Sequence, residues 1–229
     1  MLNWIPLLTL GIATAAFSIN LLRRSNETAT RWFILSIVFW FLLATTTIAY
    51  DFFNNPVTSA DFFPGFVLLA TLMTAGLFPI LFYIKSKVLR QALLAVNLKV
   101  LIAMQFYRIG GLVFISAALV GSMPTYYGLF VGTFDLIVAF SSIFLIAVGT
   151  LKYRTIRLHS IVGISDFVIA ITWYALMFPL PVIGNIVSHD NSLHGLGAWP
   201  LSFIALYAVP ISICLHLLTI EKAKIVLIP

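Results

Sequence analysis

Residues 125–149 read TYYGLFVGTFDLIVAFSSIFLIAVG, and this stretch decides the fold class. It contains one charged side chain, Asp135, and is long enough to cross a bilayer, for which a helix needs about 20 mostly apolar residues. A backbone in lipid must satisfy its own hydrogen bonds, which leaves helices or a closed barrel. Barrel strands alternate apolar and polar residues over about 10 positions, whereas this run is continuously apolar, so we expect a helix.

The rest of the chain has the same character. Of the 229 residues, 62% are hydrophobic and 9% are charged, whereas a soluble domain has about 45–50% and about 25%. We therefore predict an all-α fold, a polytopic transmembrane bundle of seven helices forming a single domain over 1–229. The predicted helices are 4–22, 31–50, 63–84, 101–121, 125–149, 160–181 and 198–219.

The basic residues predict the orientation of these helices. In a seven-span arrangement, twelve of the thirteen Lys and Arg residues fall at joints on one side of the membrane: Arg23, Arg24, Arg31, Lys85, Lys87, Arg90, Lys99, Lys152, Arg154, Arg157, Lys222 and Lys224. The positive-inside rule places that side in the cytoplasm. We therefore expect the N-terminus outside and the C-terminus in the cytoplasm. The net charge of +6 then reflects topology, with the lipid bilayer as partner and no nucleic acid.

One cytoplasmic joint is longer than the others. Residues 87–99 (KVLRQALLAVNLK) place Lys87, Arg90 and Gln91 near one helical face and Leu89 and Leu93 near another. This pattern is typical of a helix lying in the membrane interface. A cytoplasmic extension of the helix 101–121 explains it nearly as well, and the sequence leaves both readings open.

Three charged residues lie inside the predicted spans: Arg108, Asp135 and Asp166. A charge at the centre of the bilayer costs at least about 2.5–3.5 kcal/mol, so such residues usually face the bundle interior and pair with one another. All three fall at overlapping depths on consecutive helices, and Gln105 lies one helical turn before Arg108. We therefore predict a polar cluster of Arg108 with one or both carboxylates, supported by Gln105.

Small residues mark the inward faces of the same helices. Glycines at Gly111, Gly128, Gly132 and Gly163 fall at helical spacing from the three charged residues, and Gly128 and Gly132 form a GxxxG motif. Small residues let helix backbones approach closely in membranes. We expect these glycines to be helix-packing positions, so that the fourth, fifth and sixth helices pack around Arg108.

The cluster favours a small solute-binding or proton-coupled transporter as the function. In this reading Arg108 anchors an anionic group or holds one carboxylate, and Asp135 or Asp166 takes up a proton. A structural ion pair that fixes helix register explains the same residues about as well. The alternative function is a non-catalytic accessory subunit of a larger membrane complex, since there is little extramembrane mass; a homo-oligomer is also open. An intramembrane enzyme ranks last because no nucleophile or metal set is recognisable.

No metal and no cofactor are predicted. His189 and His194 are too few to define a metal site. His159 and His216 fall near the predicted cytoplasmic surface, where two imidazoles can ligate a haem. We expect them to be interface residues instead, because His has many uses.

Several motifs in the C-terminal half resemble a known group of proteins. They are Gln105–Gly111 (QFYRIGG), Gly132…Asp135, Gly163…Asp166, and the ending Trp199-Pro200, Val209-Pro210 and Leu215-His216-Leu217-Leu218. The chain resembles short bacterial seven-helix integral membrane proteins, a family without a known activity. The resemblance implies a multi-pass protein of the bacterial inner (cytoplasmic) membrane and carries over no function.

Overall fold

The structure is a computed structural model, and it describes residues 5–24, 28–49, 81, 84–149, 151–177 and 204–228. These residues form helices and the short turns between them, and no strand occurs among them. The all-α prediction is therefore confirmed for this part of the chain. The helices are α1 Ile5–Arg24, α2 Thr28–Ala49, α4 Lys87–Leu94, α5 Leu98–Ala103, η2 Met104–Gly111, α6 Leu112–Leu119, α7 Thr125–Val148, α8 Tyr153–Met177, η4 Ile204–Ala208 and α11 Val209–Leu227.

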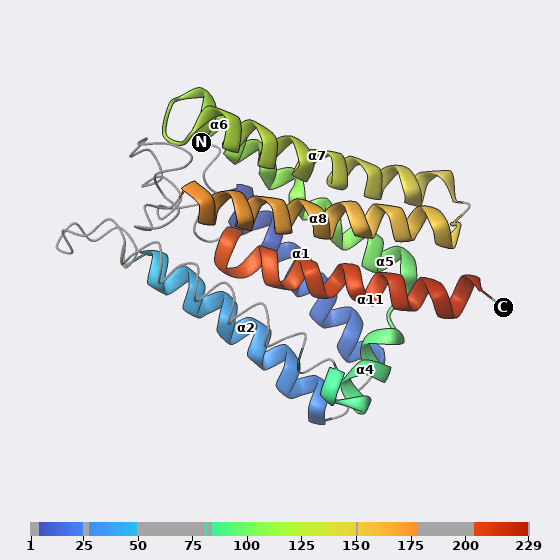
Figure 1. The fold of residues 1–229 in the computed structure, drawn as a ribbon. Coiled ribbons are helices and arrows are strands. Elements are labelled where there is room, and N and C mark those ends of the chain that lie inside the picture. The colour runs from blue at the N-terminus through green and yellow to red at the C-terminus, as the bar shows by residue number, and fades with distance from the viewer. Residues whose placement is uncertain are drawn as a thin grey trace.

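The long helices lie side by side in one bundle (Figure 1). α7 packs against the consecutive helical segments α5, η2 and α6 on one side and against α8 on the other. α11 also packs against α8. α1 crosses η2, and α2 packs on α1. The middle of the bundle is thus formed by η2, α7, α8 and α11.

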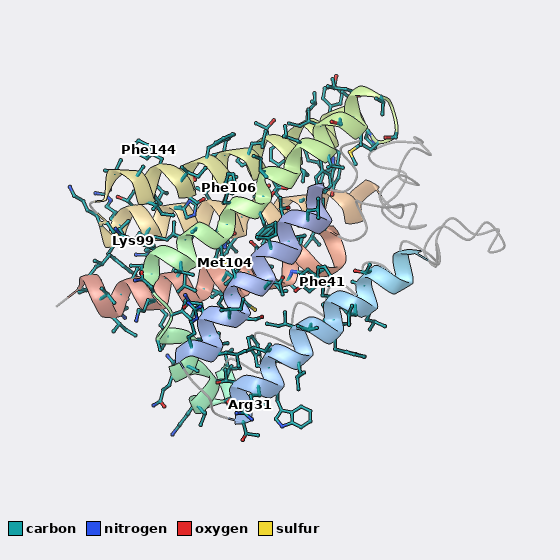
Figure 2. The ribbon with its side chains drawn as sticks, turned by 180° about the vertical axis from the view of Figure 1, so that it is seen from behind. Arg31, Phe41, Lys99, Met104, Phe106 and Phe144 are labelled. Carbon is teal, nitrogen blue, oxygen red and sulfur yellow. The ribbon has the colours of Figure 1, made fainter. Side chains whose placement is uncertain are left out.

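One end of this bundle gathers the basic termini of the helices. The C-terminus of α1, the N-terminus of α2, helix α4, the α7–α8 joint and the C-terminus of α11 all lie toward that end (Figure 1). Arg31 and Lys99, labelled in Figure 2, come from the start of α2 and the start of α5. The α6–α7 turn lies at the opposite end.

Local sequence explains where α7 stops and starts. Pro124 precedes its first residue, and Gly149 ends it with a left-handed φ of 74°. Glycine adopts this conformation without the steric penalty of a Cβ, so it commonly follows the last turn of a helix. The predicted span 125–149 therefore agrees with α7 to within one residue.

The predicted start of one helix and the predicted end of another are wrong. The helix predicted at 160–181 begins at Tyr153, and the helix predicted at 198–219 continues to Leu227. In both cases charged residues next to the apolar run were read as a joint, although Lys and Arg are good helix formers and extend the helix. The prediction for 63–84 lies almost entirely outside the described residues.

The two readings of 87–99 are resolved by helix caps. The side chain of Ser86 accepts a hydrogen bond from the backbone N–H of Leu89 (3.2 Å) and caps α4. The side chain of Asn97 accepts from the N–H of Lys99 (2.9 Å) and begins α5. Because Asn97 is extended, α4 is a separate helix that ends at Leu94 and not an extension of α5.

The apolar face of α4 packs on the bundle. Leu89 and Leu93 are buried in one cluster with Leu21 of α1, Ile34 of α2 and Leu215 of α11. An exposed ion pair joins Arg90 of α4 to Glu221 of α11. The helix in this segment is thus shorter than the predicted 87–99, and its buried face contacts α1, α2 and α11. Its location in the membrane interface stays a prediction.

Two segments at the middle of the bundle depart from α-helical geometry. The helix predicted as 101–121 is helical from Leu98 to Leu119, but its central residues Met104–Gly111 form a 3₁₀-helix. Ile204–Ala208 forms a π-helical turn just before Pro210. Pro210 has no N–H to donate to the preceding turn, which favours such a change of pitch. Both departures occur next to Arg108, as described below.

The outer surface of the bundle is apolar. Phe39 of α2, Phe144 of α7 and Leu158 of α8 are exposed by 64%, 66% and 61%, and Phe144 is labelled on α7 in Figure 2. Within the described ranges, three helical stretches are long and apolar enough to cross a membrane: Leu98–Leu119, Thr125–Val148 and Tyr153–Trp173. Apolar side chains outside and charged side chains inside are the arrangement expected of a protein surrounded by lipid.

Candidate functional site

Arg108 lies at the centre of the bundle, 2% exposed. Its Nε donates to Oδ1 of Asp135 on α7 at 2.6 Å. Its second terminal nitrogen, Nη2, donates to Oδ2 of Asp166 on α8. Arg108 therefore pairs with both carboxylates, and the sequence alone had left that choice open.

The remaining groups around the guanidinium come from α8 and α11. Nη1 of Arg108 donates to the backbone oxygen of Gly163 at 3.4 Å and lies 3.5 Å from Nε2 of His216. The ring of Phe167 lies against the guanidinium, with its centroid 4.2 Å from Cζ. A cation over an aromatic face is attracted by the ring quadrupole. All three nitrogens of the guanidinium and one of its faces thus have a contact.

The two carboxylates are satisfied unequally. Asp135 and Asp166 are 5% and 1% exposed, and each gives one oxygen to Arg108. Oδ1 of Asp166 is buried and has no hydrogen-bond partner within the described part of the chain. One guanidinium faces two carboxylates, so the three ionised groups together carry one surplus negative charge.

Gln105, predicted to support the cluster, bonds to a neighbouring helix and not to Arg108 within the described part of the chain. Its Oε1 accepts a hydrogen bond from the hydroxyl of Ser212 on α11 at 2.8 Å. Its Nε2 is buried without a partner among the described residues. Gln105 therefore ties η2 to α11 beside the cluster, and its support of the site stays a prediction.

The four predicted packing glycines all lie at close helix contacts. A Cβ on Gly111 would lie 2.5 Å from Cβ of Asp135, and a Cβ on Gly132 would lie 2.5 Å from the carbonyl oxygen of Gly111. A Cβ on Gly128 would lie 2.7 Å from that of Ala118. Real Cβ atoms do not approach so closely, so η2 and α6 reach α7 only because these side chains are absent.

Gly163 has a different neighbour, the imidazole of His216. A Cβ on Gly163 would collide with Nε2 of His216 and lie 3.0 Å from Nη1 of Arg108. The missing side chain thus creates the space that His216 fills. His216 is fully buried, and His159 of α8 lies beside it with a ring-centroid distance of 5.6 Å.

Both histidines, expected near the cytoplasmic surface of the membrane, are buried inside the bundle. Their depth in the membrane stays a prediction. His216 was placed near the end of a helix ending at 219, whereas α11 continues beyond that point to Leu227. His159 was placed at the start of a helix beginning at 160, but α8 begins at Tyr153. A histidine inside an apolar run is itself a signal of an intramembrane site, and this signal was available in Leu215-His216-Leu217-Leu218.

A small cavity borders the cluster. It is lined by Arg108, Asp135 and Gly111, together with Tyr107, Phe167, Ala208 and three other residues, Leu10, Gly110 and Ile204. Its volume of about 10 Å³ is at the lower limit for one ordered water molecule. The hydroxyl of Tyr107 donates to the carbonyl of Ala208 at 3.1 Å across this region. The cavity therefore lies between the 3₁₀ segment and the π-helical turn.

The family of the chain is established by a match over most of its length. Residues 63–222 match the family described as "Domain of unknown function (DUF8737)". The chain belongs to the DUF8737 family. Neither the curated proteins nor the solved structures give a match. The match is consistent with the resemblance to a family without a known activity.

The DUF8737 match includes every residue of the cluster. It begins before α4 and ends within α11, so it spans Arg108, Asp135, Asp166 and His216. Helices α1 and α2 lie outside it. The family unit is therefore the part of the bundle that holds the charged centre.

Proposed function

We propose that this DUF8737 protein is a seven-span protein of the bacterial inner (cytoplasmic) membrane, in which Arg108, Asp135 and Asp166 form a proton-binding site of a small transporter. The observation that carries the proposal is the buried surplus carboxylate, with Oδ1 of Asp166 unpaired among the described residues. A single structural ion pair accounts for one acid and one base and leaves the second acid unexplained.

The arrangement of the helix ends supports the seven-span topology. α2 runs from the basic end of the bundle to the opposite end, and α4 begins again at the basic end (Figure 1). The segment 50–86 joins these two points and contains the predicted helix 63–84. One crossing there keeps all twelve basic residues on the side that the positive-inside rule assigns to the cytoplasm.

The geometry of the cluster favours a proton as the bound species. The cavity has about the size of one water molecule, which leaves no room for a larger solute in this conformation. One proton on either carboxylate makes the cluster of Arg108, Asp135 and Asp166 neutral. Charge that is uncompensated inside a protein or a membrane is costly, so binding a proton relieves that cost.

The irregular helical segments supply a means of opening the site. η2 and η4 border the cavity from two sides, and mid-helix 3₁₀ or π geometry often marks a hinge or a functional site. Transporters commonly place binding sites at interrupted helices near the centre of the bilayer. In this proposal, protonation of the cluster weakens the attachment of α8 to Arg108 and lets the segments move apart.

Proteoliposomes test the proposal directly. The purified protein is reconstituted with a pH-sensitive dye inside, and acetate, succinate, phosphate, glutamate or glucose is added outside under an imposed pH gradient. We expect at least one probe to accelerate proton movement in the wild type but not in Asp166→Asn. If none of these probes changes the rate of proton movement, and that rate is the same in liposomes with and without the protein, the transporter proposal is wrong.

The accessory-subunit alternative has its own supporting observation. Outward-facing positions of α1 and α2 are large and apolar, including Ile12, Ile19, Trp32, Leu35 and Phe39. Lipid covers such faces, and so does a partner helix. Purification in a mild detergent with a mass measurement separates the two: a stoichiometric partner favours the accessory subunit, and a monomer or homo-oligomer favours the transporter.

A further inference from the structure

The histidine pair occupies the space between the cluster and the basic end of α8. His159 precedes Asp166 by about two helical turns on the same inward face of α8, and Gly163 lies between them. His216 of α11 fills the gap over Gly163. All three side chains are buried, and His159 lies about two turns from the start of α8, between that helix end and Asp166.

In each imidazole, one ring nitrogen contacts a polar atom and the other has no hydrogen-bond partner among the described residues. Nδ1 of His159 lies 2.9 Å from the hydroxyl of Ser141, and Nε2 of His216 lies 3.5 Å from Nη1 of Arg108. Nε2 of His159 and Nδ1 of His216 are buried without a partner within the described ranges. Buried polar atoms are nearly always hydrogen-bonded, so two orphans on adjacent rings call for a functional explanation.

The contact with Arg108 determines which tautomer His216 adopts. A guanidinium has only donors, so Nε2 of His216 accepts and the ring proton is on Nδ1. A neutral imidazole in this state can bind a proton at Nε2 and release another from Nδ1. His216 therefore has its accepting nitrogen toward the cluster, as the last member of a proton pathway requires.

A metal ion explains the pair less well. No group of three or more His, Cys, Asp or Glu side chains with metal-binding geometry occurs among the residues that the structure describes. Sites with fixed geometry use three or four protein ligands.

We propose that His159 and His216 form a proton pathway between the cytoplasmic end of α8 and Asp166. This inference rests on the proposed proton site. When a proton leaves Asp166, the contact of Nε2 of His216 with Arg108 opens and an N–H bond forms at that nitrogen. The rings turn to bring Nδ1 of His216 to Nε2 of His159, where the N–H bond at Nδ1 breaks and one at Nε2 forms. His159 then releases its own proton from Nδ1 on the side of the Ser141 hydroxyl. Inward transfer reverses these steps, and the rings return to their starting tautomers.

The charged and titratable groups around His216 fit this role. Arg108 approaches from η2, His159 and Asp166 approach from α8, and Asp135 of α7 lies on the other side of the guanidinium. The positive charge of Arg108 disfavours a long-lived imidazolium at His216. Transfer is therefore expected to be concerted, with one proton arriving as another leaves.

Time-resolved infrared spectroscopy tests the pathway. Protein in detergent starts at a pH where the carboxyl group of Asp166 is ionised, a laser flash releases protons from a caged acid, and the band of the protonated carboxyl group is followed. The variants are His159→Gln and His216→Gln, with His189→Gln as a matched control outside the pair. Asp166→Asn identifies the band.

We expect both pathway variants to reach the wild-type amplitude about a hundredfold more slowly, the lower end of what a positioned proton-transfer group contributes. His189→Gln should keep the wild-type rate. If His216→Gln does not fold, His159→Gln decides the question. Unchanged rates in a folded variant overturn the pathway and leave the proton site intact. If the wild type shows no carboxyl band at any pH, the proton site itself is wrong.

Discussion

At the scale of single residues, Arg108 decides how the centre of the molecule is held together. Its guanidinium bonds to α7 through Asp135 and to α8 through Asp166, and it contacts α11 through His216. A planar guanidinium presents five N–H donors in a fixed fork, which a lysine cannot reproduce. The three charged residues were found from the sequence because charges are rare in apolar runs.

Replacing Arg108 should destabilise the protein strongly. Arg108→Gln leaves two carboxylates buried without a counter-charge, and removing one partner of a buried pair costs about 3–5 kcal/mol. Thermal or denaturant unfolding in detergent measures the effect. Arg90→Gln is the matched control, because Arg90 is half-exposed in its pair with Glu221 and such pairs contribute no more than about 1 kcal/mol. Equal effects of the two substitutions would show that the cluster is not held by Arg108.

Removing the surplus charge should have a much smaller effect. Asp166→Asn keeps the size of the side chain and leaves Arg108 paired with Asp135 as one positive and one negative group. We expect Asp166→Asn to lower the free energy of unfolding by less than half as much as Arg108→Gln. A larger loss than that of Arg108→Gln would contradict the view that Asp166 carries the excess charge.

At the scale of elements, the helices approach closely where side chains are missing. Gly111 and Gly132 face each other across η2 and α7, and their positions follow from small residues at helical spacing. The 3₁₀ geometry of Met104–Gly111 and the π-helical turn at Ile204–Ala208 could not be predicted, because pitch changes depend on tertiary packing and leave no periodic signal. Helix ends were missed where charged residues continue an apolar helix.

Alanine at these contacts should disturb the bundle. Gly111→Ala brings a Cβ to 2.5 Å from that of Asp135, and over-packing of this kind costs about 1–3 kcal/mol. Gly11→Ala in α1 is the matched control, because its nearest atom, Cζ of Phe41, lies at an ordinary 3.7 Å. We expect the unfolding midpoint to fall for Gly111→Ala only. A fall of similar size for Gly11→Ala would indicate a general intolerance of alanine.

At the scale of the whole molecule, charge and hydrophobicity are distributed in the reverse of the soluble pattern. Large apolar side chains cover the outside of α2, α7 and α8, and the charged cluster is inside. The all-α fold and the presence of helices long and apolar enough to cross a membrane were predictable, since both follow from the length and composition of the apolar runs. The position of His216 against Arg108 could not be predicted, because it depends on how α11 packs against α8.

Cysteine labelling tests the orientation in the membrane. In a Cys214→Ala background, Ser122→Cys in the α6–α7 turn and Lys152→Cys in the α7–α8 joint are treated with a membrane-impermeant maleimide. Both positions are exposed, at opposite ends of α7. We expect Ser122→Cys to be labelled in intact cells and Lys152→Cys only after permeabilisation. The reverse pattern would invert the topology, and labelling of both in intact cells would exclude α7 as a span.

The most direct test of the central claim is an infrared pH titration of the purified protein. If Arg108, Asp135 and Asp166 bind a proton, the absorption band of a buried protonated carboxyl group, at higher frequency than the bands of solvent-exposed acids, appears as the pH is lowered while the protein stays folded. The account predicts that this band is absent from the double variant Asp135→Asn/Asp166→Asn and present in Asp51→Asn, an acid outside the cluster. A wild-type protein without such a band, or a band that survives the double substitution, would contradict it.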